Sequence, residues 1–252
     1  PVTFTDVDLT DIGHSASITG VVASDTITGL TLTNPQLLAL VNPGTVTKAS
    51  GSSSGSLNMN FSAPATALDY LAVGEKLTLT YTVAVNDGDG GITPQTFVVS
   101  ITGTNDAPVL TVTDVAGVIT EGSALSDAGS IAFADLDLTD RPTATETTKS
   151  VVATKAGGTE LLLTAAQQAA IENAFTITPS TTNTNNGTIN WNYSIAEGSL
   201  NFLAAGENVT AVFTVTVIDN NGSTLTQDVT VNITGTNDAP VLIAPDVAGV
   251  IT

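Results

Sequence analysis

The sequence contains no cysteine, one histidine (His14) and only five lysine and arginine residues among 252. The absence of cysteine excludes disulfides, thiolate-bound metals and a catalytic thiol. A single histidine excludes zinc sites built from several histidines and disfavours a Ser-His-Asp triad. We expect His14 to be a surface residue rather than a ligand. Because the few basic side chains are scattered, they form no basic patch for nucleic acid or an anionic membrane.

Aromatic residues make up only 4% of the chain, and apolar stretches such as 37–41 are far too short to span a bilayer. We therefore expect no nucleic-acid partner and no direct membrane contact. Acidic residues, in contrast, number 24 and give a formal net charge of −19. An apolar fraction of 42% is enough for a packed core, so this acidity does not indicate disorder. The chain starts at Pro1 without a signal-like segment, and we interpret it as part of a longer protein.

Internal repetition is the strongest feature of the sequence. Residues 101–110 recur letter for letter as 233–242, which is 132 residues later, and 114–120 recur as 246–252. Residues 68–75 resemble 200–207 at the same offset, whereas 4–11 resemble 133–140 at an offset of 129. The sequence therefore predicts a repeat over 1–106 that lacks its first strand, a second over 107–238, and the first strand of a third over 239–252.

Within each repeat, apolar residues alternate with threonine and other small or polar residues. The alternation is clear in 77–85 and 209–217, and turn sequences such as 86–91 separate the segments. This pattern predicts half-buried antiparallel strands, and several such strands in about 100 residues are typical of a sandwich. Only 164–174 and, in the first repeat, 35–41 have the pattern of a short helix. We predict an all-β protein of tandem Ig-like, Greek-key β-sandwiches, with a short helix in the second repeat and the aromatic residues in the core.

Several carboxylates occupy repeated positions in predicted turns and strand ends. They are the acidic turns Asp6, Asp8, Asp11 and Asp135, Asp137, Asp140; the strand ends Asp87 and Asp219; the pairs Asn105-Asp106 and Asn237-Asp238; and Glu75, Glu121 and Glu207. Clustered carboxylates repel one another unless a cation lies among them. Oxygen ligands without histidine or cysteine select a hard cation, and flexible Asp-rich loops favour Ca²⁺ over Mg²⁺. The alternative is an acidic surface that keeps the protein soluble, with acids in turns for backbone reasons.

The residues 74–75, 81–88 and 101–109 together resemble the VCBS repeat of giant, secreted RTX-type bacterial adhesins. The same motif order resembles the cadherin repeat: Asp135-Leu-Asp137 is similar to its Asp-x-Asp, and 236–240 to its Asp-x-Asn-Asp-Asn-Ala-Pro linker. Gly103 and Gly235 replace the acidic residue that opens the cadherin linker, so the number of ions per junction stays open.

The resemblance implies Ca²⁺ as the cofactor and assigns its ligands. One complete junction would contain Glu75, Asn105, Asp106, Asp135, Asp137 and Asp219. Half of a preceding junction would contain Asp6, Asp8 and Asp87, and half of a following one Glu121, Glu207, Asn237 and Asp238. The implied protein is a non-enzymatic extender on the bacterial cell surface, exported by type I secretion. Ca²⁺ would stiffen it so that it projects a distal adhesive domain for attachment or biofilm formation.

Other functions remain open from the residues alone. Paired aspartates could act as acid and base in glycoside hydrolysis, but catalytic constellations rarely recur along one chain. A Ca²⁺-dependent carbohydrate- or ligand-binding module is the main alternative. The expected partners are neighbouring repeats of the same adhesin. Because 241–252 copies the strand that the first repeat lacks, we also consider self-association by strand exchange between two chains.

Overall fold

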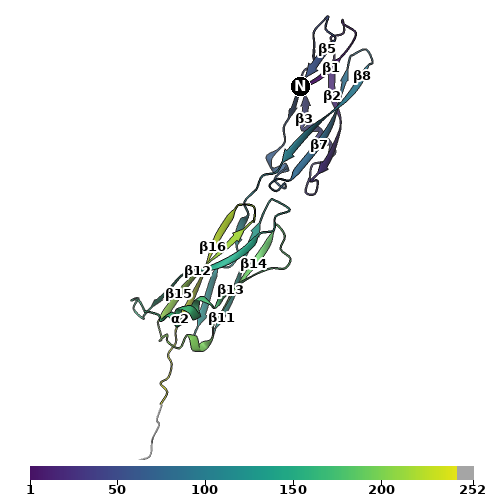
Figure 1. The fold of residues 1–252 in the computed structure, drawn as a ribbon. Coiled ribbons are helices and arrows are strands. Elements are labelled where there is room, and N and C mark those ends of the chain that lie inside the picture. The colour runs from purple at the N-terminus through teal and green to yellow at the C-terminus, as the bar shows by residue number, and fades with distance from the viewer. Residues whose placement is uncertain (243–252) are drawn as a thin grey trace, which may run out of the picture. The chain divides into compact units, whose positions relative to one another are not determined.

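The computed structural model describes residues 1–242 (Figure 1) and consists mainly of β-strands, as the alternating pattern predicts. The described residues form two compact units. The first contains Pro1–Ala107 together with two loop segments, Asp135–Asp140 and Asn221–Ser223. The second contains Pro108–Ala134, Arg141–Asn220 and the described residues from Thr224 on. Of the predicted first strand of a third repeat, 239–252, only residues 239–242 are described. The rest, 243–252, lies outside the described residues.

The first unit is built from short sheets around an apolar core. Its strands are β1 (Val2–Thr5), β2 (Ser15–Asp25), β3 (Val41–Pro43), β4 (Thr47–Lys48), β5 (Ser54–Leu57), β6 (Met59–Phe61), β7 (Lys76–Asn86) and β8 (Ile92–Thr102). They are ordered β2-β7-β8, β1-β5-β4 and β3-β6, with antiparallel pairing throughout. The inward residues of β7, including Leu77, Leu79 and Tyr81, are fully buried, so the period of two is confirmed.

The second unit is a sandwich of two four-stranded sheets. Its strands are β9 (Val109–Val112), β10 (Ala116–Thr120), β11 (Ser126–Ala134), β12 (Thr143–Thr154), β13 (Phe175–Pro179), β14 (Gly187–Ser194), β15 (Asn208–Ile218) and β16 (Thr224–Thr234). The sheet orders are β10-β16-β15-β12 and β13-β14-β11-β9. The pair β10 and β16 is parallel, and the other pairs are antiparallel. The fold class predicted from the sequence is confirmed.

Aromatic side chains fill the core of this sandwich. Trp191, Tyr193 and Phe213 are at most 1% exposed, and the rings of Phe175 and Phe213 stack with centroids 4.2 Å apart. Rings of this size bury large apolar areas, which stabilises the contact between the two sheets. The core role predicted for the aromatic residues is confirmed at these positions.

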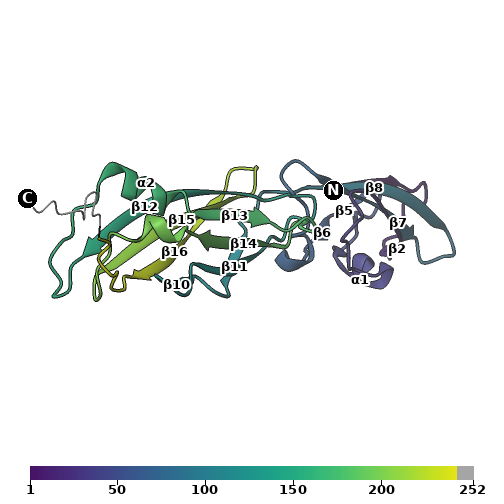
Figure 2. The same ribbon diagram turned by 90° about the horizontal axis from the view of Figure 1, so that it is seen from below.

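Both predicted helices form, as α1 (Asn34–Ala39) and α2 (Ala165–Glu172). Each begins after a threonine whose backbone N–H donates to a glutamine side chain three residues later. α2 packs beside β12 (Figure 2). In each unit a buried tyrosine hydroxyl donates to a carbonyl of the helix: Tyr81 to Leu37 and Tyr193 to Ile171. One-turn 3₁₀ segments, Ala65–Ala67 and Glu197–Ser199, precede β7 and β15.

The repetition of the sequence reappears in the longest hairpin of each unit. β7 and β8 cover 76–86 and 92–102, and β15 and β16 cover 208–218 and 224–234, so both strands shift by 132 residues. Glu75 and Glu207 directly precede the hairpins, Asp87 and Asp219 lie in the hairpin turns, and the two Asn-Asp pairs follow the hairpins. The fold therefore places these acids at the strand ends, in loops.

Candidate metal centre

Three aspartates of the loop between β11 and β12 are buried together. Asp135, Asp137 and Asp140 are 4%, 0% and 3% exposed, whereas Leu136 between them is 57% exposed. One carboxylate oxygen from each lies within 4.8 Å of the others. The loop is held by its own backbone: Asp137 N–H donates to Asp135 Oδ1 at 3.0 Å, and Asp140 N–H donates to the Asp137 carbonyl at 3.1 Å. The alternating acid and apolar residues thus turn every carboxylate of this loop inward.

The predicted linker pair meets this loop within the first unit. The backbone N–H of Asp106 donates to Asp137 Oδ2 at 2.8 Å. Asn105 Nδ2 donates to Ser223 Oγ at 3.0 Å, and Asn221 Nδ2 donates to Asp140 Oδ1 at 2.6 Å. Two distant stretches of the sequence, 105–106 and 221–223, therefore meet at the loop of the buried aspartates.

The electrostatic environment of Asp137 favours neutralisation of its negative charge. The pKa of Asp137 is raised to about 6, chiefly by burial and also by the neighbouring charges of Asp140, Asp135 and Asp106, against the lowering effect of the Asp106 N–H. Asp137 Oδ1 has no hydrogen-bond partner among residues 1–242. A buried carboxylate oxygen without a donor is costly unless a cation contacts it. The potential ligand atoms grouped with Asp137 are carboxylate oxygens of Asp135 and Asp140, which fit a hard cation such as Ca²⁺.

Two further residues of the predicted junction occupy strand ends. Asp219 directly follows β15 and is fully buried. Glu75 precedes β7, is half-buried, and accepts a hydrogen bond from the Ala72 N–H at 3.1 Å. Their role as ligands stays a prediction.

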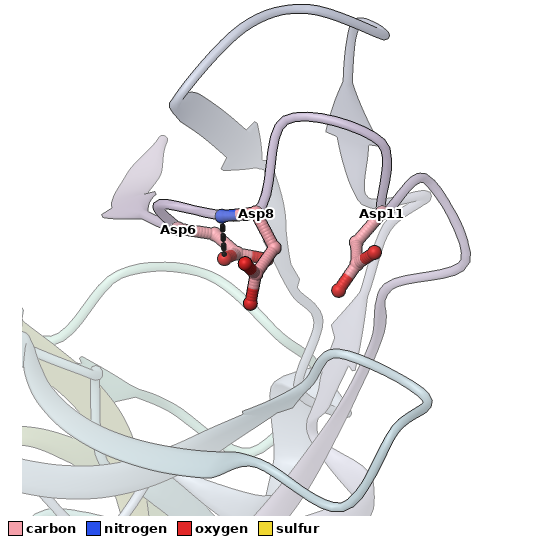
Figure 3. Close-up of side chains that lie close together, drawn as sticks. All are labelled: Asp6, Asp8 and Asp11. Atoms are coloured by element: carbon pink, nitrogen blue, oxygen red, sulfur yellow. Dashed lines mark hydrogen bonds between the residues drawn. The ribbon is translucent and has the colours of Figure 1, made fainter.

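The acidic turn near the N-terminus has the same composition but is more exposed. Asp6, Asp8 and Asp11 each offer a carboxylate oxygen within 4.8 Å of the other two, and the three carboxylates point to the same side of the loop (Figure 3). Asp8 N–H donates to Asp6 Oδ1 at 2.9 Å, and this bond lowers the pKa of Asp6. Desolvation raises the pKa of Asp11, followed by the charges of Asp89 and the other two acids.

Two side chains, Lys48 and His14, form hydrogen bonds to this acidic turn. Lys48 is 9% exposed, and its Nζ donates to the carbonyls of Asp8 at 2.8 Å and Asp11 at 2.7 Å. The His14 side chain is only 3% exposed, lies 5.0 Å from the Phe4 ring, and places Nε2 2.8 Å from Asp6 Oδ2. The expectation of a surface histidine was therefore wrong, because the ring packs under the acidic turn. No periodic signal in the sequence marks either contact.

Asp87, the other predicted residue of this end, is engaged by its own loop. Its Oδ1 accepts from the N–H groups of Asp89 and Gly91 at 2.8 and 2.9 Å, and these bonds lower its pKa. They give Asp87 a loop-forming role whether or not it binds a cation.

The remaining predicted ligands belong to the second unit. Glu121 is 1% exposed, its Oε2 accepts from the Thr236 N–H at 2.8 Å, and its Oε1 has no partner among the described residues. Glu207 Oε2 accepts from the Ala204 N–H at 3.0 Å. Asn237 and Asp238 are exposed, with Asn237 Nδ2 donating to the Asp238 carbonyl at 3.2 Å.

Sequence reasoning missed three polar residues that contact these groups. Asn221 and Ser223 reach the linker and the buried aspartates from the loop between β15 and β16. Glu197 Oε2 accepts from the Gly122 N–H at 3.1 Å, next to Glu121. Asp140 belongs to the repeated acidic turn but was not among the predicted ligands. Its repeat in the sequence, as Asp11, was the available signal.

Among the described residues, no helix is both long and apolar enough to cross a membrane. No family model and no curated protein matches the sequence, so the likeness to VCBS repeats stays a resemblance.

Among solved structures, the chain is similar to cadherin extracellular domains. Human CDH23 EC21-23 is 15% identical with a TM-score of 0.41, over 88% of this chain and 58% of that one. Mouse clustered PcdhgC3 EC1-3 is 12% identical with a TM-score of 0.37, over 84% and 60%. Human mucin-like protocadherin EC1-2 is 13% identical with a TM-score of 0.38, over 90% and 85%. The chain thus spans less than two thirds of the first two structures, and the candidate cation ligands rest on the geometry described above.

Proposed function

We propose that this chain is a non-enzymatic, Ca²⁺-stiffened extender segment of an extracellular adhesin, with repeats over 1–106 and 107–238. The observation that carries the proposal is the burial of Asp135, Asp137 and Asp140 in one loop, with the linker N–H of Asp106 bonded to Asp137. A bacterial cell-surface location, type I secretion and the projection of a distal adhesive domain belong to the same proposal.

The charge of the group supports a divalent cation. Asp106, Asp135, Asp137 and Asp140 together carry four negative charges when ionised, which two Ca²⁺ ions would balance. The three buried carboxylates would hold the cation, and Asn105 and Asn221 add amide groups beside them. Since Ca²⁺ takes about six to eight oxygen ligands, Asp219 and Glu75 complete the proposed set.

The linker is the part of the chain on which such a cation would act. Asp106 follows Asn105 and precedes the Ala107-Pro108 step, where the repeated sequence passes from one repeat to the next. Bound Ca²⁺ would remove the repulsion among the carboxylates and tie the linker to the loop. Rotation between successive repeats would then be restricted, and a string of repeats would become a stiff spacer.

The expected stabilisation by bound Ca²⁺ is large compared with the free energy of unfolding of a domain. Extracellular Ca²⁺ modules bind with dissociation constants of roughly 10⁻⁴–10⁻³ M. With free Ca²⁺ at about 100 times that constant, one site stabilises the folded state by about 2.7 kcal/mol. Few domains have a free energy of unfolding much above about 5–15 kcal/mol, so this gain is a large fraction of the total.

The test is a Ca²⁺ titration followed by calorimetry and small-angle scattering. We expect saturable binding, a higher melting temperature and a longer, less variable particle. Asp137→Asn should abolish these changes, whereas Glu146→Gln, which removes one negative charge from an exposed position on β12, should leave them intact. If Ca²⁺ changes neither the melting temperature nor the scattering of the unmodified chain, the proposal is wrong.

A further inference from the structure

The sequence contains two Asn-Gly steps, Asn186-Gly187 and Asn221-Gly222, and the structure places them differently. An asparagine side chain reacts most readily with its own backbone when glycine follows, because glycine has no Cβ to shield its nitrogen. Gly187 is the first residue of β14 and lies opposite Phe133 of β11. Asn221 and Gly222 lie outside any strand, in the exposed turn between β15 and β16.

The surroundings of the two glycines differ in the same sense. A Cβ added at Gly187 would lie 2.3 Å from Asn183 Oδ1 and 2.7 Å from Phe133 Cζ, so this backbone is packed against neighbouring side chains. A Cβ added at Gly222 would meet nothing within 4 Å. The open turn therefore leaves the Gly222 backbone room to approach the Asn221 side chain, whereas β14 holds its own Asn-Gly step in place.

The turn between β15 and β16 requires glycine at position 222. Gly222 has a φ of 126°, a backbone conformation in which a residue with a side chain would be strained. The same turn brings the Asn221 side chain to the acidic loop, where its Nδ2 donates to Asp140 Oδ1 at 2.6 Å. The glycine that permits this turn is therefore also the residue that exposes Asn221 to reaction with the backbone.

The amide of Asn221 contacts a buried acidic group. Asp140 is 3% exposed and offers a carboxylate oxygen within 4.8 Å of those of Asp135 and Asp137. An N–H donor stabilises the charge of Asp140, whereas an ionised carboxylate at position 221 could only accept hydrogen bonds. Loss of the Asn221 amide would therefore reverse the interaction at this position from attraction to repulsion.

We propose that Asn221 is a site of spontaneous deamidation, a modification that consumes only water. The backbone nitrogen of Gly222 loses its proton and bonds to Asn221 Cγ, the Cγ–Nδ2 bond breaks, and Nδ2 leaves as ammonia. The product is a cyclic imide. Water then breaks the N–Cγ bond, which gives aspartate, or the bond from this nitrogen to the main-chain carbonyl carbon, which gives isoaspartate. No oxidant or reductant takes part.

The consequence of this modification rests on the proposed function. Aspartate at position 221 removes the hydrogen bond to Asp140 and adds a carboxylate beside the three buried aspartates. Without a cation, the added repulsion at a buried group lowers the stability of the folded chain. With Ca²⁺, the same carboxylate supplies a further oxygen ligand, and the affinity of such sites rises with ligand charge. Deamidation thus makes the loop more dependent on its cation as the protein ages.

The first test measures the reaction itself, in chelator. The full chain is incubated in warm, mildly alkaline buffer, and peptide mass spectrometry follows both Asn-Gly steps. In the folded chain Asn221 should convert several-fold faster than Asn186 and give both aspartate and isoaspartate, whereas in urea the two rates should be equal. Asn221→Gln, which would have to form a larger ring, should stay unmodified. An intact Asn221, conversion of Asn186 at the same or a higher rate in the folded chain, or aspartate without isoaspartate would overturn the proposal.

The second test measures the consequence with Asn221→Asp, which is the aspartate product. Asn186→Asp is the matched control, because it adds the same charge at an exposed position of the second unit. In chelator Asn221→Asp should melt at a lower temperature than the unmodified chain, and its Ca²⁺ dissociation constant should be about tenfold lower. Asn186→Asp should change neither, and equal effects of the two variants would contradict the inferred consequence. If the unmodified chain binds no Ca²⁺, the proposed function and this consequence are both wrong, whereas the deamidation stands or falls with the first test.

Discussion

The Asp106 N–H donates a 2.8 Å hydrogen bond to Oδ2 of Asp137, the most deeply buried acid of its loop. The two residues are 31 positions apart, and both belong to repeated motifs. The bond stabilises the ionised form of Asp137, but desolvation and three neighbouring negative charges act against it. The chain thus holds a carboxylate ionised at neutral pH at a cost in folding free energy.

The first prediction concerns pH in the absence of divalent cations. The pKa of Asp137 is raised from 3.8 to about 6 in the folded state, so the folded chain keeps a proton that the unfolded chain has released between these values. Stability therefore falls as pH rises from about 4 to about 6, by up to about 3 kcal/mol. Calorimetry in chelator should show a higher melting temperature at pH 5 than at pH 7. With saturating Ca²⁺ the trend should reverse, because protons then compete with the cation. The same trend in both conditions would contradict this account.

The second prediction concerns Asp137→Asn. The asparagine Oδ1 can still accept from the Asp106 N–H, but the buried negative charge is gone. In chelator at pH 7 we expect a gain of about 1–3 kcal/mol, since charge burial and repulsion are removed. In saturating Ca²⁺ the variant should be less stable than the unmodified chain. Thermal unfolding of both proteins in both conditions tests this reversal of their relative stability. A variant that is less stable in both conditions would refute it.

The third prediction concerns the core of the second unit. A Cβ at Gly129 would lie 2.6–2.7 Å from the indole of Trp191, which is 1% exposed and anchored by its Nε1–H to the Asp114 carbonyl at 2.7 Å. Gly129→Ala should therefore cost about 1–3 kcal/mol through overpacking.

Trp191 is the only tryptophan, so its fluorescence reports urea unfolding of this unit directly. Gly198→Ala is the matched control, because a Cβ there meets nothing within 4 Å. Equal urea midpoints for the two variants would show that the indole can move aside.

The fourth prediction concerns Lys48→Met, which keeps the length of the side chain and removes its ammonium group. Two charge-assisted hydrogen bonds to the carbonyls of Asp8 and Asp11 are lost. We expect the first unit to lose about 1.5–3 kcal/mol and the 6–11 turn to exchange amide hydrogens faster. Exchange in the second unit should be unchanged. Unaltered protection of the turn would mean that Lys48 does not hold it.

The fold could be predicted because its signals are local. A period of two in 77–85 predicts β7, and the 132-residue repeat carries the same result to β15. The helices α1 and α2 were predicted from the same kind of local pattern, and their boundaries differ by one to two residues from those expected. The linker pair and the acidic turn were singled out as repeated motifs.

The contacts around the acids could not be predicted in the same way. Asn221 reaches Asp140 across 81 residues, and Lys48 reaches Asp8 across 40, so only the tertiary fold brings them together. The burial of His14 was not predicted, because a lone histidine after a turn belongs to no periodic pattern that would indicate which way its side chain faces. The burial of its ring against Phe4 depends on how β1 and β2 pack.

The parallel pairing of β10 with β16 has a consequence for how the second unit resists a mechanical pulling force. These are the second strand and, within residues 1–242, the last strand of the second unit, and they run in the same direction over their whole shared length. A pull that draws the two ends of the unit apart acts along both strands, so their hydrogen bonds resist together instead of opening one by one. A domain joined in this way should withstand tearing better than one whose end strands peel from a hairpin.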